Sequence, residues 1–249
     1  MAPTTVDGLD VDDVTIDGDV VDEITMDGDV VYQAFSIGES VVEDFEHNDM
    51  QANWIGAVSS LSAETQNSEV YGGNYALKTD NSSSSQSMVY DGPNEPPVRG
   101  DRIRWYGKWT GEEQRVSYGF LLSDYDASDI RSQSDGYLFR LSSFDSEAII
   151  RRMDGGDEND IEQTSVSWPT GTWIEYQATF SADGTIELAG RKAPDYNEQP
   201  VEWDSDDEFF SLSESDSTYD SGDIGMLHHD AFSSDPMYHD LFVIWDSGF

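Results

Sequence analysis

Paired carboxylates are the first residues in this sequence whose spacing could do chemistry. Two carboxylates about 5–5.5 Å apart can cleave a glycosidic bond, one as nucleophile and one as acid. Asp145 and Glu147 have the alternate spacing that places two side chains on one face of a strand. The strand then continues with apolar residues and two arginines, while the WIEYQ segment contributes only Glu175. In a chain with 52 acidic residues such pairs arise by chance, so we interpret this one as a solvated strand face and expect no enzyme.

Histidines near the end of the chain suggest a zinc site. His228 and His229 are followed by His239, and Asp230 or Asp240 could supply a further ligand. Adjacent residues of a strand point to opposite faces, so both members of the pair cannot easily bind one ion. We therefore expect His228 and His229 to lie at the end of a strand, and His239 to lie on the closing strand.

The segment RMDGGDENDIE contains the best candidate for a calcium site. Asp154, Asp157 and Asp160 surround two glycines, and carboxylate oxygens are the ligands that calcium prefers. The spacing differs from that of an EF-hand loop. The alternative is a hydrated hairpin tip that binds no ion, and no other cofactor is expected.

The segment RIRWYGKW is the only strip of the chain that mixes basic and aromatic residues. Strand alternation divides it into two faces. One face carries Ile103, Trp105, Gly107 and Trp109, and the other carries Arg102, Arg104, Tyr106 and Lys108. We predict that the first set lies in a core, and that the second contacts an acidic glycan or an acidic neighbouring subunit.

Short strands must position all of these residues. From residue 38 onward, runs of five to nine residues alternate apolar and polar side chains, separated by Gly, Asn, Asp, Ser and Pro. No helical period persists. The pattern predicts an all-β sandwich over residues 38–249.

Residues 1–37 predict a separate β-meander. Asp-Gly pairs at Asp7-Gly8, Asp17-Gly18 and Asp27-Gly28 lie between β-branched runs, which is the strongest short signal for a hairpin. Strands this small bury little apolar area and are marginal alone. We therefore interpret the block, and in particular Asp17, Gly18, Asp27 and Gly28, as a docking or oligomerisation module.

The formal charge of -40 restricts the environment and the partners. At about 1 M salt the Debye length is only ~3 Å, so the repulsion among these carboxylates is screened. The composition is typical of proteins that work in molar salt, and a negative field of this size repels nucleic acid. No signal peptide and no apolar run long enough for a membrane span is evident, so we expect neither a secreted precursor nor a membrane protein.

The block from Val42 to Ile244 resembles the concanavalin-A-like lectin/glucanase jelly roll, also called the laminin-G-like sandwich. The segments VVEDFEHNDMQANWIG, SEVYGGNYALKTD and TGTWIEYQATFSADGTIEL carry the resemblance, with SGDIGML and MYHDLFVI near the end. The resemblance implies an antiparallel jelly roll. These motifs are structural positions, so they specify the fold better than an activity.

The segment VTIDGDVVDEITMDGDVV resembles the N-terminal meanders of virion surface and tail proteins from tailed viruses of salt-loving archaea. This resemblance implies a noncatalytic virion protein on a capsid vertex, a turret or a tail fibre. Its expected partners are sister copies in a trimer or pentamer, other virion proteins, and a host surface glycan or glycoprotein. The alternatives are a glycan hydrolase or lyase on the same sandwich, and an architectural decoration protein without a ligand.

Overall fold

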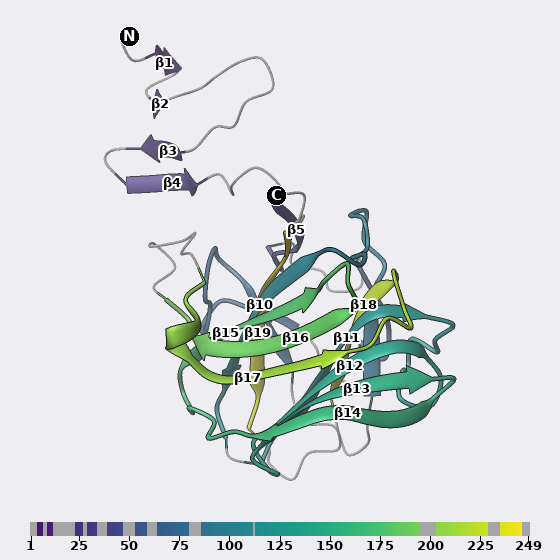
Figure 1. The fold of residues 1–249 in the computed structure, drawn as a ribbon. Coiled ribbons are helices and arrows are strands. Elements are labelled where there is room, and N and C mark those ends of the chain that lie inside the picture. Colours follow the sequence, from purple (N-terminus) through teal and green to yellow (C-terminus); the bar gives the residue numbers. More distant parts are fainter. Residues whose placement is uncertain are drawn as a thin grey trace.

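The computed structural model describes residues 4–6, 9–11, 23–26, 29–33, 39–46, 53–58, 64–79, 86–111, 113–194, 203–228 and 235–245. In this part of the chain two antiparallel sheets pack face to face, and the N-terminal strands form a third, small sheet (Figure 1). The all-β prediction is confirmed. The described residues contain one helical turn, the 3₁₀ turn Ser205–Asp207, and no helix long and apolar enough to cross a bilayer.

One layer of the sandwich is an eight-stranded sheet whose neighbours come from distant parts of the chain. Its order is β17 (Glu208–Ser215), β16 (Thr185–Lys192), β15 (Trp173–Phe180), β10 (Arg102–Trp109), β19 (Met237–Trp245), β8 (Ala76–Thr79) and β7 (Glu64–Gln66), and β5 (Glu39–Glu43) also pairs with β19. Strand β10 is therefore held between β15 and β19.

The other layer is a seven-stranded sheet. Its order is β14 (Asp157–Ser165), β13 (Glu147–Asp154), β12 (Asp135–Ser142), β11 (Arg115–Ser123), β18 (Asp223–His228), β9 (Gln86–Tyr90) and β6 (Trp54–Gly56). Strands β11 to β14 form a consecutive meander, and β18 and β9 join it from the two ends of the sandwich sequence. This exchange of strands between two antiparallel layers is the jelly-roll arrangement.

The core between the sheets follows from strand alternation. Ile103, Trp105 and Trp109 are fully buried, as predicted from their shared face. The Trp105 ring lies 5.0 Å from Tyr118 and 5.4 Å from Tyr176, measured between centroids. Aromatic rings of this size dominate the area that a sandwich buries. They fix β10 so that its alternate residues face outward.

The N-terminal sheet consists of β1 (Thr4–Val6), β2 (Leu9–Val11), β3 (Glu23–Met26) and β4 (Asp29–Gln33). Pairing of Val6 with Leu9, and of Met26 with Asp29, leaves two-residue connections at 7–8 and 27–28. Hairpins are therefore present at two of the three predicted positions. Asp17, Gly18, Asp27 and Gly28 themselves lie outside the described residues, and the docking role stays a prediction.

Strand β14 begins directly after a two-residue connection at Gly155 and Gly156, so the two glycines form the tip of a hairpin between β13 and β14. Asp157 and Asp160 belong to this strand, which pairs with β13 along its length. It is the last strand of its sheet, and its side chains are exposed or half-buried on both faces. An edge strand needs no apolar face and is protected by charge from pairing with other chains, so the alternating pattern is absent.

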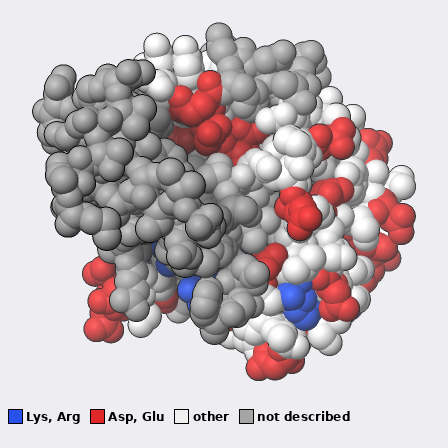
Figure 2. Space-filling view, turned by 90° about the horizontal axis from the view of Figure 1, so that it is seen from above, with Lys and Arg blue, Asp and Glu red and all other residues white. Residues whose placement is uncertain are grey.

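Acidic side chains are spread over the surface. In the view of Figure 2, Asp and Glu occupy much of the described surface, and Lys and Arg appear at few places. The three lysines of the chain, Lys78, Lys108 and Lys192, all lie on strands of the eight-stranded sheet. That sheet is therefore less acidic than the rest of the chain.

Candidate functional site

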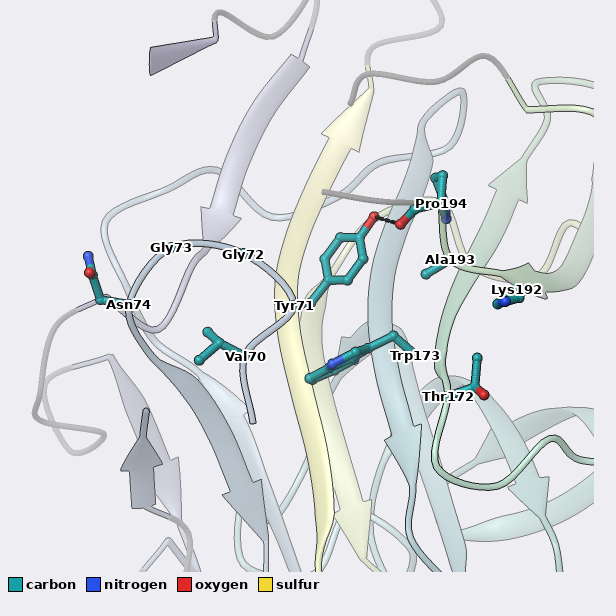
Figure 3. A pocket seen from close by; sticks show the side chains of 10 residues that line it. All are labelled: Val70, Tyr71, Gly72, Gly73, Asn74, Thr172, Trp173, Lys192, Ala193 and Pro194. Atoms are coloured by element: carbon teal, nitrogen blue, oxygen red, sulfur yellow. Dashed lines mark hydrogen bonds between the residues drawn. The ribbon is translucent and has the colours of Figure 1, made fainter. Parts of the chain in front are cut away.

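A pocket of about 780 Å³ lies on the outer face of the eight-stranded sheet, the face away from the core. The connection between β7 and β8 forms one wall, and the ends of β15 and β16 form the other (Figure 3). The lining residues are Val70, Tyr71, Gly72, Gly73, Asn74, Thr172, Trp173, Lys192, Ala193 and Pro194. The lining residues therefore include two aromatic residues, a threonine, a lysine and two glycines.

Tyr71 is the central side chain of the pocket. Its ring stacks on Tyr106 of β10 with centroids 4.0 Å apart and planes inclined by 16°, and Trp173 of β15 lies 5.9 Å away. Figure 3 shows Tyr71 reaching over the sheet, where its hydroxyl donates a 2.9 Å hydrogen bond to the carbonyl oxygen of Pro194. Tyr71 thus connects the two walls.

Two carboxylates hold the backbone of the Tyr71 turn. Asp240 Oδ2 accepts hydrogen bonds from the amides of Tyr71 and Gly72, at 3.0 and 3.1 Å. Glu46 Oε1 accepts from the amides of Asn74 and Tyr75, at 2.6 and 2.9 Å. The chain is therefore clamped at both ends of this tight turn.

Gly73 permits the close approach of Glu46. Its φ is +64°, in the left-handed region that favours glycine, and a Cβ atom there would collide with the Glu46 carboxylate. The Asn74 side chain points away from Tyr71 in Figure 3 and donates a 3.0 Å hydrogen bond to Glu46. Asn74 therefore supports the turn.

A buried charge cluster forms the floor beside the pocket. Glu175 is fully buried and accepts hydrogen bonds from the Tyr106 hydroxyl at 3.0 Å and from Arg191 Nε at 2.6 Å, while Arg104 Nη1 lies at 3.5 Å. The Trp203 ring covers both guanidinium groups, with Cζ of Arg191 at 4.6 Å and of Arg104 at 5.5 Å from its centroid. Burial lowers the pKa of Arg104, and the charge of Glu175 opposes this.

The basic strip predicted on β10 is partly buried beneath the pocket and the Glu175 cluster. Arg102, Arg104, Tyr106 and Lys108 share the outer face, as alternation predicts, but Arg104 and Tyr106 are each only 3% exposed. The cluster around Glu175 and the Tyr71 ring cover these two side chains, and their contact with a glycan or a neighbouring subunit stays a prediction. Lys108 is half-buried and forms an ion pair with Glu69, and Arg102 is exposed.

The predicted calcium ligands do not converge. Asp154 accepts hydrogen bonds from Arg152 and from the Tyr219 hydroxyl, and Asp160 pairs with Arg151. Among the residues that the structure describes, no three His, Asp or Glu side chains form a group that could hold an ion. The calcium prediction gains no support from these contacts.

The histidines that are described are core residues. His239 is fully buried, with Nε2 3.0 Å from the Thr79 hydroxyl and Nδ1 2.8 Å from the Tyr118 hydroxyl. Burial lowers the pKa of His239 to about 3, and His228 nearby adds to the shift. His239 is therefore neutral at ordinary pH, while His229 lies outside the described part of the chain.

Sequence reasoning missed Tyr71, Trp173, Lys192 and Asp240 as members of one site. A signal for Trp173 was present, because Ile174 and Tyr176 are apolar and the alternation applied to β10 places Trp173, Glu175 and Gln177 on the outer face. No sequence signal places the Tyr71 turn over that face. This contact depends on Asp240, which is 169 residues away from Tyr71.

Solved structures share the fold of this chain at very low sequence identity. A legume lectin-like domain from Entamoeba histolytica is 9% identical, with 82% of this chain and 97% of that chain covered and a TM-score of 0.55. A Bacillus subtilis protein described as having a galectin-like fold is 11% identical, with 83% and 96% covered and a TM-score of 0.54. The globular domain of T. cruzi calreticulin is 11% identical, with 83% and 88% covered and a TM-score of 0.53.

No protein-family model matches the chain, and no curated protein matches it. The structural likeness therefore shows the fold alone. The sandwich is an antiparallel jelly roll, the fold class that the sequence predicted, and it shares this fold with the galectin-like and legume lectin-like structures.

Proposed function

We propose that this chain is a noncatalytic saccharide-binding protein, and that the pocket between Tyr71 and Trp173 receives the sugar. The pairing of aromatic rings with polar groups in one cavity carries the proposal. Saccharide sites need an aromatic face for the C–H side of the ring and a few polar groups for its hydroxyls. Trp173 offers the face, and the Tyr71 hydroxyl and the backbone of the Tyr71 turn offer polar groups.

The chemistry of the lining favours binding over cleavage. Hydrolysis of a glycosidic bond needs two carboxyl groups that reach the substrate. The described residues that line the pocket include neither Asp nor Glu. Glu175, on the same face, is fully buried and paired with two arginines. A hydrolase or lyase is therefore the weaker alternative.

We further propose that the protein is displayed on a virus particle in a high-salt environment, and that it attaches the particle to a host surface glycan. The net charge of -40 supports the high-salt environment. The N-terminal sheet, which shares no described strand with the sandwich, supports a separate docking module. Display as a trimer or pentamer, on a capsid vertex or a tail, would raise weak single-site affinity by avidity.

Saccharide binding is tested by calorimetry in molar salt with maltotriose, chitotriose, trigalacturonate and oligosaccharides released from host surface glycoproteins. Replacing Trp173 with Ala should weaken binding at least about tenfold, which corresponds to roughly 1.4 kcal/mol. Phe144→Ala is the matched control, because Phe144 is an exposed aromatic residue (43%) in the turn after β12 of the other sheet. Equal affinities for wild type and Trp173→Ala would overturn the proposed site.

The virion role is tested by deleting residues 1–37 and measuring particle incorporation and cell attachment separately. The proposal expects the truncated protein to be lost from particles while the isolated sandwich still binds saccharide. Normal incorporation of the truncated protein would show that the N-terminal block is not the docking module.

A further inference from the structure

Asp240 is a buried carboxyl group placed directly under the turn that forms the pocket. It is 1% exposed, and its Oδ2 accepts hydrogen bonds from the amides of Tyr71 and Gly72. The side chain of Tyr71 extends from this turn to the opposite wall of the pocket, where its hydroxyl donates a hydrogen bond to the carbonyl oxygen of Pro194. Any movement of the turn away from Asp240 would therefore move Tyr71 out of the pocket and admit water to the carboxyl group.

Burial raises the pKa of Asp240 to about 8. Amide hydrogen bonds from Gly72, Tyr71 and Leu241 act in the opposite direction, and the neighbouring Glu46 adds to the rise. Loss of hydration outweighs the amides because a charge is costly to bury without a cationic partner. Once the turn opened, the carboxyl group would return to water, where an Asp titrates near 3.9.

The sign of the pH effect follows from this difference. The closed turn binds the proton more tightly than the open turn, so low pH favours closure. Between about pH 4 and about pH 8, each rise of one pH unit lowers the ratio of closed to open turn by up to about tenfold. Above about 8 both forms are ionised, and the shift stops.

We propose that Asp240 is a positioning residue of the pocket, which holds the turn from Tyr71 to Tyr75 closed when its carboxyl group is protonated and releases the turn when it ionises. This inference rests on the proposed saccharide site for its functional consequence. Saccharide affinity should be highest with the turn closed and fall as pH rises.

Other ionisable groups lie near Asp240 on the neighbouring strands β10 and β8, on β19 itself and on the connection between β7 and β8. Tyr106 lies opposite on β10, and burial raises its pKa well above the usual range, so it stays a neutral phenol. Lys108 on β10 is paired with Glu69 of the β7–β8 connection. The ionisable residues on these elements are Glu46, Glu69, Tyr71, Tyr106, Lys108, Tyr238 and Lys78, the last of which pairs with Tyr238 from strand β8. Glu46, at the other end of the turn, is the informative control.

The ligand-free full chain provides the first test, by NMR in molar salt. The carboxyl carbon of Asp240 should titrate far above the ordinary Asp value, and the amide resonances of Tyr71 and Gly72 should change in step with it. In Asp240→Asn, which cannot ionise, these amides should show no such transition. In Glu46→Gln the transition should persist. An ordinary Asp240 titration, or the same amide transition in Asp240→Asn, would overturn the inference.

Calorimetric titration with maltotriose, chitotriose and trigalacturonate provides the second test. Wild-type affinity should fall by up to about tenfold per pH unit while Asp240 ionises, whereas the affinity of Asp240→Asn should stay constant. Binding that is independent of pH in the wild type would overturn the positioning role and leave the proposed function standing. Amide transitions without binding of any of the three sugars at any pH would support the turn movement and count against the proposed function.

Discussion

Tyr71 and Tyr106 stack ring on ring, with centroids 4.0 Å apart, although one lies in a connection and the other in the middle of strand β10. This contact places the turn after β7 onto the outer face of the eight-stranded sheet. Because Tyr106 also donates to the buried Glu175, the stack links the pocket to the charge cluster beneath it.

The hydroxyl of Tyr71 should matter less for stability than for the shape of the pocket. Tyr71→Phe keeps the ring stack but removes the 2.9 Å hydrogen bond to Pro194. We expect a loss of about 1 kcal/mol in the free energy of unfolding, typical of one such bond, and weaker saccharide binding. Denaturant titration and calorimetry measure the two effects. Unchanged binding would show that the link between the walls is not needed.

Glu175 should be a strong stability determinant. Glu175→Gln removes the only carboxylate that the described contacts place between Arg104 and Arg191, which are both buried. Removing one partner of a buried ion pair costs about 3–5 kcal/mol, so the free energy of unfolding should fall by that order. Glu187→Gln, at an exposed position of the same sheet, should change it by no more than about 0.5 kcal/mol. Similar values for the two variants would contradict this account of the floor.

Salt should stabilise the whole chain. With 52 acidic against 12 basic residues, repulsion among carboxylates opposes the compact state. The Debye length falls from about 8 Å at physiological ionic strength to about 3 Å at 1 M, so the melting temperature should rise steeply over this range. Calorimetric melting in a NaCl series measures this. A melting temperature that is flat or falls with salt would remove the basis for the high-salt environment.

His239 should make the fold sensitive to mild acid. Its pKa is about 3 in the folded chain and about 6.5 when unfolded, so the unfolded state binds the extra proton first. Above about pH 6.5 the neutral His239 makes its full contribution to the free energy of unfolding. This contribution is lost progressively as the pH falls toward 3. His239→Phe should therefore show a shallower fall in the free energy of unfolding between pH 6.5 and 5. An imidazole that titrates near 6.5 in the native protein by NMR would contradict this.

The sequence predicts the sandwich because burial is periodic in its strands. The alternation in β10 places Trp105 inward and Arg104 outward without any knowledge of neighbouring strands. The same reasoning fails for β14, whose residues need no apolar face at the edge of a sheet. It also overestimates the exposure of Arg104, because Glu175 and Trp203, which cover it, are distant in the sequence.

The candidate site was largely invisible in the sequence for a related reason. Tyr71, Trp173 and Asp240 lie on three segments, and the contacts that join them are a hydrogen bond from a backbone amide to a carboxyl group and a tilted ring contact. Such contacts leave no spacing pattern. Only the outward direction of Trp173 followed from strand alternation.

The most direct test of the saccharide site is to follow the Trp173 indole resonance by NMR while host-surface oligosaccharides are added in molar salt. The account predicts that Trp173 and the amides of Tyr71 and Gly72 shift together and saturate, while the Phe144 resonances stay constant. Saccharide binding that shifts residues of the seven-stranded sheet and leaves Trp173 unchanged would contradict it.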